Sequence, residues 1–251
     1  MLAQHSFSSR GVGFRERFDI LLPELTVISQ PVWKMYPNMV PITRKYLLSF
    51  QGQINGEKGL DPTTASLIDS LKQMSKTKTQ DRFLFSFDCI VDQQLEVFHG
   101  DWGLCGEESQ RIESLQASTF ALIIAPSSTA FVHARGLRIR LYESLRSGSI
   151  PVILGSDTIL PFSEYLDWTR FSIQLPRARV SELHYILRTL TFSDLFGLKR
   201  QVCHLFPFFK KEFSGLNSGW KKHRFFKKKA QPNVFLGLYS VFCFFFSFFF
   251  F

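Results

Sequence analysis

The chain alternates short apolar runs with segments in which apolar residues recur every three or four positions. Apolar runs of strand length occur at residues 45–50, 83–90, 119–126, 151–155 and 171–176. The run TFALIIAP at 119–126 is apolar on both faces, which is typical of a strand in a parallel sheet covered by helices on both sides. The pattern therefore predicts a buried parallel sheet.

The segments between these runs have the spacing of amphipathic helices. From residue 63 to residue 74, the apolar side chains fall on one helical face. Further helices are predicted at 105–118, 137–147, 180–190 and 193–201. Ser193 is the expected N-cap of the last of them. The alternation of strands and helices with short connections predicts an open α/β sheet with right-handed crossovers, which is a Rossmann-type lobe.

One helix and the strand after it show how the chain changes direction. In the helix at 138–146, Leu141 and Leu145 are one turn apart and are expected to face the sheet. Gly148 stands where a helix end requires a positive φ. Pro151 is expected at the first position of the next strand, where it removes no ladder hydrogen bond.

Ligands of such sheets bind outside the carboxyl ends of the strands. In this chain the loops expected there are 51–62, 88–104, 125–137 and 155–164. Arg140 and Glu143 lie on the helix that follows one of these loops. An arginine offers a planar fork to a diphosphate, and a carboxylate can accept the hydroxyl hydrogens of a ribose. Their spacing alone favours a plainer interpretation, a surface ion pair on one helix.

Composition fits a globular chain of one large or two small domains, but the charge is uneven. The 251 residues are 45% hydrophobic and 20% charged. Residues 199–251 contain ten basic residues and one acid, Glu212, so they account for the whole net charge of +9. The basic balance is therefore a property of the tail and does not indicate nucleic-acid binding by the folded part.

The cysteines argue against a zinc site, because none of the four lies in a CxxC pair. Cys89 and Cys105 are close enough in sequence to be joined across a loop, which would suit an oxidising compartment. Two unpaired buried thiols are the alternative at this point.

Several longer stretches resemble the exostosin family (glycosyltransferase family 47 domain), most closely its exostosin-like 3 branch. They are RKYLLSFQG (44–52), WGLCGEESQRIESLQASTFALIIAP (102–126), IRLYESLRSGSIPVILGSDTILPFSEYLDW (139–168) and RARVSELHYILRTLTFSDL (177–195). The resemblance is continuous from about residue 3 to residue 201, and several separate motifs agree.

The resemblance implies a GT-B architecture, in which two Rossmann-like lobes flank the active site and the C-terminal lobe binds most of the donor nucleotide. Residues 1–44 would be a remnant of the first lobe, and 45–201 the nucleotide-sugar lobe. The family implies a UDP-sugar donor, a glycosaminoglycan or proteoglycan acceptor, and other exostosin-family proteins as partners. It also implies heparan sulfate synthesis by a lumenal domain at the membrane of the Golgi or endoplasmic reticulum, held there by an N-terminal anchor that this chain is expected to lack. It implies no cofactor for this lobe.

The same resemblance assigns the candidate site. Arg140 and Glu143 match the arginine and glutamate of the family's R-L-x-E-A-L helix, the implied nucleotide contacts. Arg138 replaces a small residue that many family members have at that position, and Arg135 lies just upstream, so either arginine could hold a diphosphate or block it. No residue stands out as the catalytic base.

Three further expectations follow from the match. Gly148 and Pro151 correspond to framework positions of the family, and Cys89 and Cys105 correspond to two cysteines of the exostosin-like 3 branch, which favours a lumenal disulfide. The chain has no D-x-D triplet, the carboxylate pair with which a metal-dependent transferase holds its cation. No metal site is therefore expected.

After residue 201 the resemblance stops. Residues 202–251 end in 18 uncharged, mostly apolar residues at 234–251, preceded by KKHRFFKKK. This tail would be either a membrane segment, since a span takes about 20 residues, or translated non-coding sequence. We expect the chain to be incomplete and its own transfer activity to be weak or absent. The alternative is a non-catalytic exostosin-fold scaffold or binding module in a glycosyltransferase complex.

Overall fold

The computed structural model describes most of the predicted lobe. The described residues are 3–4, 20–21, 40–54, 62–76, 81–91, 102–125, 135–155, 158, 160–161, 163 and 166–202. β1 (Ala3–Gln4) and β2 (Ile20–Leu21) pair in parallel as a separate two-stranded ladder. The predicted tail at 202–251 lies outside the described residues, apart from its first residue.

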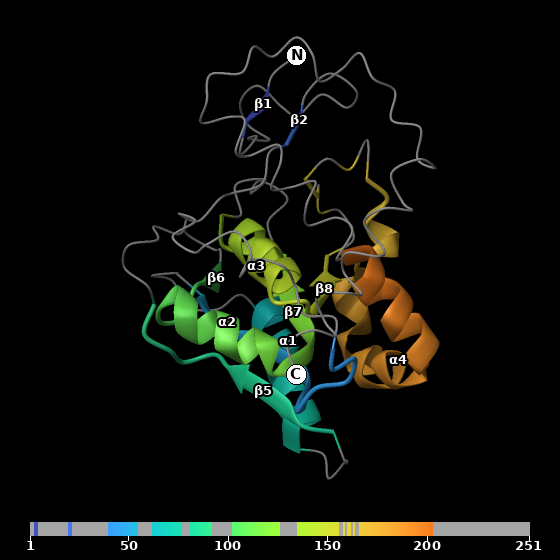
Figure 1. Cartoon of the computed structure of the whole chain (residues 1–251). Coiled ribbons are helices and arrows are strands. Elements are labelled where there is room, and N and C mark those ends of the chain that lie inside the picture. The colour runs from blue at the N-terminus through green and yellow to red at the C-terminus, as the bar shows by residue number, and fades with distance from the viewer. Residues whose placement is uncertain are drawn as a thin grey trace.

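Five strands form one sheet, and every neighbouring pair is parallel (Figure 1). The strands are β3 (Tyr46–Gln51), β5 (Phe83–Ser86), β7 (Ser118–Ile124), β8 (Ile150–Leu154) and β9 (Ile173–Leu175). β7 and β8 are buried along their whole length, as expected for strands that are covered on both faces. The predicted parallel α/β sheet is thus confirmed.

The order of the strands across the sheet is β5-β3-β7-β8-β9. The chain goes first from β3 to the neighbour on one side and then returns to β7 on the other side. β3 and β7 therefore flank the topological switch point, where ligands of doubly wound sheets bind.

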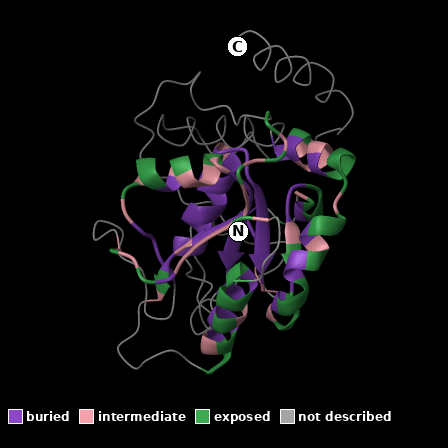
Figure 2. Cartoon of the chain, turned by 90° about the horizontal axis from the view of Figure 1, so that it is seen from below, coloured by how far each residue is buried: buried purple, intermediate pink, exposed green. Residues whose placement is uncertain are grey.

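Helices cover both faces of this sheet (Figures 1 and 2). They are α1 (Pro62–Lys76), α2 (Glu108–Gln116), α3 (Arg135–Arg146), α4 (Leu183–Thr189) and a further helix at 192–202. Side chains of α1 and α4 join one core cluster with Leu48 and Phe50, whereas Leu141 and Leu145 of α3 join the cluster on the opposite face. The arrangement is a three-layer α/β/α lobe.

The end of α3 is the turn that the sequence predicts. Gly148 has a φ of 65°, and its N–H donates to the carbonyl of Leu145 at 3.1 Å. The N–H of Ser149 donates to the carbonyl of Ser144 at 3.0 Å, which completes a Schellman motif. Gly148 is therefore the framework residue expected at this end.

Pro151 is the second residue of β8 rather than the first. The N–H of Gly155 donates to Leu175 of β9, so the alternation of the strand turns the nitrogen of Pro151 toward β9 as well. Pairing between β8 and β9 begins only at Val152 and Ile173. Pro151 therefore removes no ladder bond, for a slightly different reason than expected.

Three local predictions need correction. Strand β5 ends at Ser86 rather than at residue 90, because its ladder partner β3 ends at Gln51. The helix predicted from residue 180 begins as a 3-10 helix, Arg177–Glu182, before α4 starts. Thr191 and not Ser193 is the N-cap of the helix at 192–202.

The capping hydrogen bonds show this directly. The N–H of Asp194 donates to Thr191 Oγ1 at 3.3 Å, while the carboxylate of Asp194 accepts from the N–H of Thr191 at 2.9 Å. This is a reciprocal capping arrangement, and it places the helix start two residues earlier than the serine suggests.

Two segments expected to be loops pair with each other. β4 (Gln53–Ile54) and β6 (Trp102–Gly103) form a short antiparallel ladder just beyond the end of β3. Within the described part of the chain, no helix is long and apolar enough to cross a membrane. The apolar stretch at 234–251 lies outside that part.

Candidate functional site

The candidate site lies at the carboxyl ends of β3 and β7. The β4–β6 ladder borders the end of β3, and α3 packs beside it. Gly52 follows β3 at the point where the guanidinium of Arg140 approaches the backbone. A Cβ atom at Gly52 would lie 2.5 Å from Arg140 Nη2, so only glycine permits this approach.

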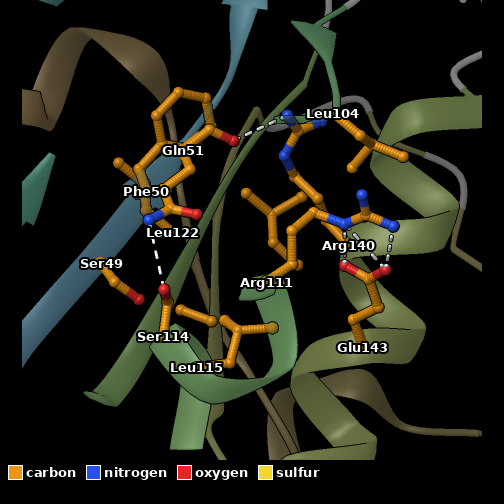
Figure 3. A pocket seen from close by; sticks show the side chains of 12 residues that line it. Ser49, Phe50, Gln51, Leu104, Arg111, Ser114, Leu115, Leu122, Arg140 and Glu143 are labelled. Atoms are coloured by element: carbon orange, nitrogen blue, oxygen red, sulfur yellow. Dashed lines mark hydrogen bonds and ion pairs between the residues drawn. The ribbon is translucent and has the colours of Figure 1, made fainter. Parts of the chain in front are cut away.

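Arg140 binds three backbone carbonyls on two segments at this edge, and Figure 3 shows its contact with Gln51. Its Nη1 donates to the carbonyl of Trp102 at 2.8 Å, and its Nη2 donates to those of Gln51 at 2.9 Å and Gly103 at 2.7 Å. The guanidinium carbon lies 5.3 Å from the centre of the Phe50 ring, a cation–π distance. The buried cation of α3 thus holds the end of β3 against β6.

Glu143, one turn further along α3, pairs with Arg111 of α2. Arg111 Nη2 and Nε donate to Glu143 Oε1 at 2.9 and 3.1 Å, and Nε also donates to Oε2 at 3.2 Å. Only 1% of Glu143 and 5% of Arg111 is exposed. Burial raises the pKa of the Glu143 carboxyl, and the hydrogen bond and charge of Arg111 together with the charge of Arg140 oppose this rise.

A cavity of about 30 Å³ lies between α2, α3 and the sheet (Figure 3). Its polar lining is Ser49, Gln51, Arg111, Ser114, Arg140 and Glu143. Gln51 Nε2 donates to Ser114 Oγ at 3.2 Å, whereas the buried Oγ of Ser49 has no hydrogen-bond partner within the described chain. Since this volume holds about one water molecule, a nucleotide would have to bind outside it, at the sheet edge.

A disulfide joins the two ends of residues 89–105, the segment that precedes α2. Cys89 and Cys105 are joined, with their Cα atoms 5.6 Å apart, and Val91 forms a backbone bridge with Cys105. The N–H of Gly106 donates to the carbonyl of Ile90 at 2.9 Å. The disulfide implied by the resemblance is therefore present, and with these backbone contacts it ties residues 105–106 to residues 89–91.

Comparison with known proteins identifies the lobe. The Exostosin GT47 domain matches residues 1–190. The chain belongs to this exostosin family. It is 32% identical over 100 residues to an exostosin-like-3 homolog of Caenorhabditis elegans, which covers 38% of this chain and 11% of that protein. It is 32% identical over 192 residues to Exostosin-2 of Homo sapiens, which covers 75% of this chain and 24% of that protein.

A probable glycosyltransferase of Arabidopsis thaliana is 24% identical over 174 residues, covering 69% of this chain and 30% of the plant protein. The exostosin chain described here thus spans about a quarter or less of the animal relatives above. Family membership and the parallel sheet agree in describing a Rossmann-like glycosyltransferase lobe.

The predicted site residues of this exostosin lobe all belong to α3, but they differ in surroundings. Arg140 and Glu143 are buried and in contact with other elements, so the alternative of an exposed ion pair on one helix is wrong. Arg138 is also buried, with 6% exposed. Arg135 is the first residue of α3, and its side chain lies outside the described atoms.

Sequence reasoning missed Arg111. A signal was available, because Arg111 precedes Leu115 by one helical turn and so shares the helix face that packs toward the sheet. Among the residues that the structure describes, no group of three or more histidine, cysteine or acidic side chains could hold a metal ion.

Proposed function

We propose that this lobe binds the UDP-sugar donor of an exostosin-type glycosyltransferase, with the diphosphate at the carboxyl edge between β3 and β7. The observation that carries the proposal is the place of Arg140, whose guanidinium lies at the end of β3 at the topological switch point. Membership of the exostosin family supports a sugar-transfer reaction.

The four predicted residues would contribute in different ways. Arg135 and Arg138 stand in the first turn of α3, where the helix dipole and positive side chains favour an anion. Arg140 and Glu143 would set the shape of the edge, because their polar atoms already bind backbone carbonyls and Arg111. The pair would therefore act on the nucleotide through the strand end and loop that it holds.

In the proposed reaction, a hydroxyl oxygen of the glycan acceptor forms a bond to the anomeric carbon of the donor sugar. The bond between that carbon and the diphosphate breaks, the hydroxyl proton is released, and UDP leaves. Arginine charges beside the diphosphate would stabilise the negative charge that develops on the leaving group. The transferred sugar would be a hexose or N-acetylglucosamine.

We further propose a heparan sulfate or proteoglycan glycan as acceptor, and the lumen of the Golgi or endoplasmic reticulum as the compartment. The relatives named exostosin support the first point, and the Cys89–Cys105 disulfide supports an oxidising compartment. In this proposal residues 45–201 form the nucleotide-sugar lobe, residues 1–44 belong to the first lobe, and other exostosin-family proteins are candidate partners.

The test is the thermal unfolding of the 251-residue chain with and without millimolar UDP. A ligand that binds only the folded state stabilises it by about 2.7 kcal/mol at a hundred times its Kd. We expect UDP to raise the Tm of the wild type and of Arg179→Ala, a change at a half-exposed arginine far along the chain. Arg140→Ala should lose the shift.

Arg140→Lys provides a second variant, since it keeps the charge but lacks the planar fork whose Nη1 and Nη2 reach the separate carbonyls. It should fold and show a reduced shift. If UDP fails to raise the Tm of the wild type, the non-catalytic scaffold becomes the better account of the chain.

A further inference from the structure

Arg111 stands at the junction of three elements near the candidate donor site. Its guanidinium leaves α2 and reaches the carboxylate of Glu143 on α3. Its Nη1 also donates to the carbonyl of Gly106 at 2.6 Å and to that of Cys105 at 3.4 Å. One buried side chain therefore connects α2, α3 and the loop 102–106.

Two arginines, one on α2 and one on α3, bind carbonyls of the loop at residues 102–106. Arg140 binds the carbonyls of Trp102 and Gly103 at its start, and Arg111 binds two carbonyls at its end. Glu143 lies one turn after Arg140 on α3 and pairs with Arg111. Arg111 is thereby tied to α3, the helix that also carries Arg140.

The Arg111–Glu143 ion pair is buried between α2 and α3. Arg111 and Glu143 are both buried and bind each other, so removal of either one alone would leave a buried charge without its partner. A buried ion pair is often no more stabilising than two well-packed apolar side chains. Because burying these two charges costs desolvation free energy, we infer that the pair has a role other than stability.

We propose that Arg111 is a positioning residue for donor binding: through Glu143 and the loop 102–106 it fixes Arg140 and the end of β3 in the arrangement that the donor requires. This inference rests on the proposed function, since it assigns Arg111 a role at the same site. In this proposal Arg111 itself contacts no substrate, because its side chain is buried and reaches from α2 to Glu143 on α3 (Figure 3).

A double variant separates positioning from folding. Arg111→Met with Glu143→Leu replaces the ion pair with apolar side chains of similar size and leaves no unpaired charge in that pair. We expect this chain to unfold near the wild-type temperature but to bind UDP about tenfold more weakly, a loss like the smallest ones found when residues that orient the ligands of a metal site are replaced. The exchange of backbone amides in residues 102–106 should become faster.

Two single variants at Arg111 are compared with the double variant in unfolding temperature and UDP affinity. Arg111→Met alone should unfold at a clearly lower temperature than the double variant, since it leaves Glu143 buried without its partner. Arg111→Lys keeps the charge but not the fork, so its affinity for UDP should lie between those of the wild type and the double variant.

The control applies the same substitutions to Arg179 and Glu182, an ion pair of which about half of each side chain is exposed. Both double variants are prepared as the 251-residue chain, and the Kd for UDP is measured by calorimetric titration. A weakened affinity in the Arg111–Glu143 variant, with the control unchanged, supports the inference.

Two other results overturn it in distinguishable ways. If the Arg111–Glu143 double variant folds and keeps the wild-type Kd, the ion pair is structural only, and the proposed function still stands. If the wild type itself binds no UDP, the proposed function fails, and the positioning role fails with it.

Discussion

At each edge of the sheet an arginine binds backbone carbonyls; Arg44 at the amino edge is half-buried, and Arg140 at the carboxyl edge is buried. At the amino edge, Arg44 Nη1 donates to the carbonyls of Leu115 at 3.1 Å and Ser118 at 3.2 Å, and Nη2 donates to that of Ser147 at 2.9 Å. At the carboxyl edge, Arg140 does the same for the end of β3 and for β6.

The acceptors differ, and the difference indicates distinct roles. Arg44 binds the last turns of α2 and α3, where a cation also interacts favourably with the helix dipoles. Burial lowers the pKa of Arg44 to about 10. Arg140 instead shares a cluster with a carboxylate and a disulfide-closed loop at the ligand edge. At the amino edge these hydrogen bonds therefore cap helix ends. At the carboxyl edge, in our proposal, similar hydrogen bonds support donor binding.

Replacement of Arg44 should produce the largest loss of stability. Arg44→Ala removes the side-chain donor to the Ser147 carbonyl and one of the donors to the Leu115 and Ser118 carbonyls, which also accept from Ser149 Oγ. We expect the free energy of unfolding to fall by about 3 to 4 kcal/mol. Urea denaturation measures the change. The neighbouring Lys45→Ala, at an exposed residue, should cost less than about 1 kcal/mol.

The same pair of variants sharpens the comparison between the edges. The fraction of Arg44→Ala that is folded should bind UDP with wild-type affinity, since the amino edge is not part of the proposed site. A loss of affinity in that folded fraction would mean that the two edges do not have separate roles.

Removal of the disulfide should come second. Cys89→Ala with Cys105→Ala opens a loop with a sequence separation of 16, and closing a loop of about 15 residues contributes about 3 kcal/mol. Because this bond ties the end of residues 102–106 to residue 89, UDP affinity should fall as well. Equilibrium denaturation and UDP titration of the same preparation measure both effects. A loss of stability with unchanged UDP affinity would show that residues 102–106 do not contribute to UDP binding.

The third prediction concerns Lys199, which is 2% exposed and donates to the carbonyl of Pro41 at 2.8 Å. Burial, and to a lesser extent the charge of Arg44, lowers its pKa from 10.5 to about 7. Between these two values the unfolded chain binds more protons at this residue than the folded chain, so the stability contributed by this residue rises with pH from 7 to 10.5.

Lys199→Met removes the buried charge and should therefore remove this rise. The variant should be more stable than the wild type below pH 7, on the order of 2 kcal/mol, and the advantage should shrink as the pH increases through 8 and 9. Urea denaturation at each pH checks this, with Arg200→Met as the exposed control. If the difference in unfolding free energy between Lys199→Met and the wild type does not depend on pH, the lysine is not a buried cation in the folded chain.

Much of the lobe could be predicted because the signals are local. The apolar run of β7 identifies a buried strand by itself, and Gly148 marks the end of α3 within a few residues of sequence. The alternation of strands and helices predicted a parallel α/β sheet, but it did not predict the order of the strands across it.

The rest depends on contacts between distant segments. β4 and β6 are two residues long and lie about fifty residues apart in the chain, so neither has a strand pattern of its own. The Arg111–Glu143 pair depends on how α2 packs against α3, and periodicity fixes the faces of helices but not their register against each other. The buried cluster beneath the site was therefore not predictable from spacing alone.

The most direct test of the account is hydrogen exchange of the 251-residue chain, measured by mass spectrometry with and without millimolar UDP. The account predicts slower exchange in residues 51–54, in 102–106 and in the first turn of α3, with no change at the amino edge around Arg44. Exchange that is unaffected by UDP, or protection confined to the amino edge, would contradict a donor site between β3 and β7.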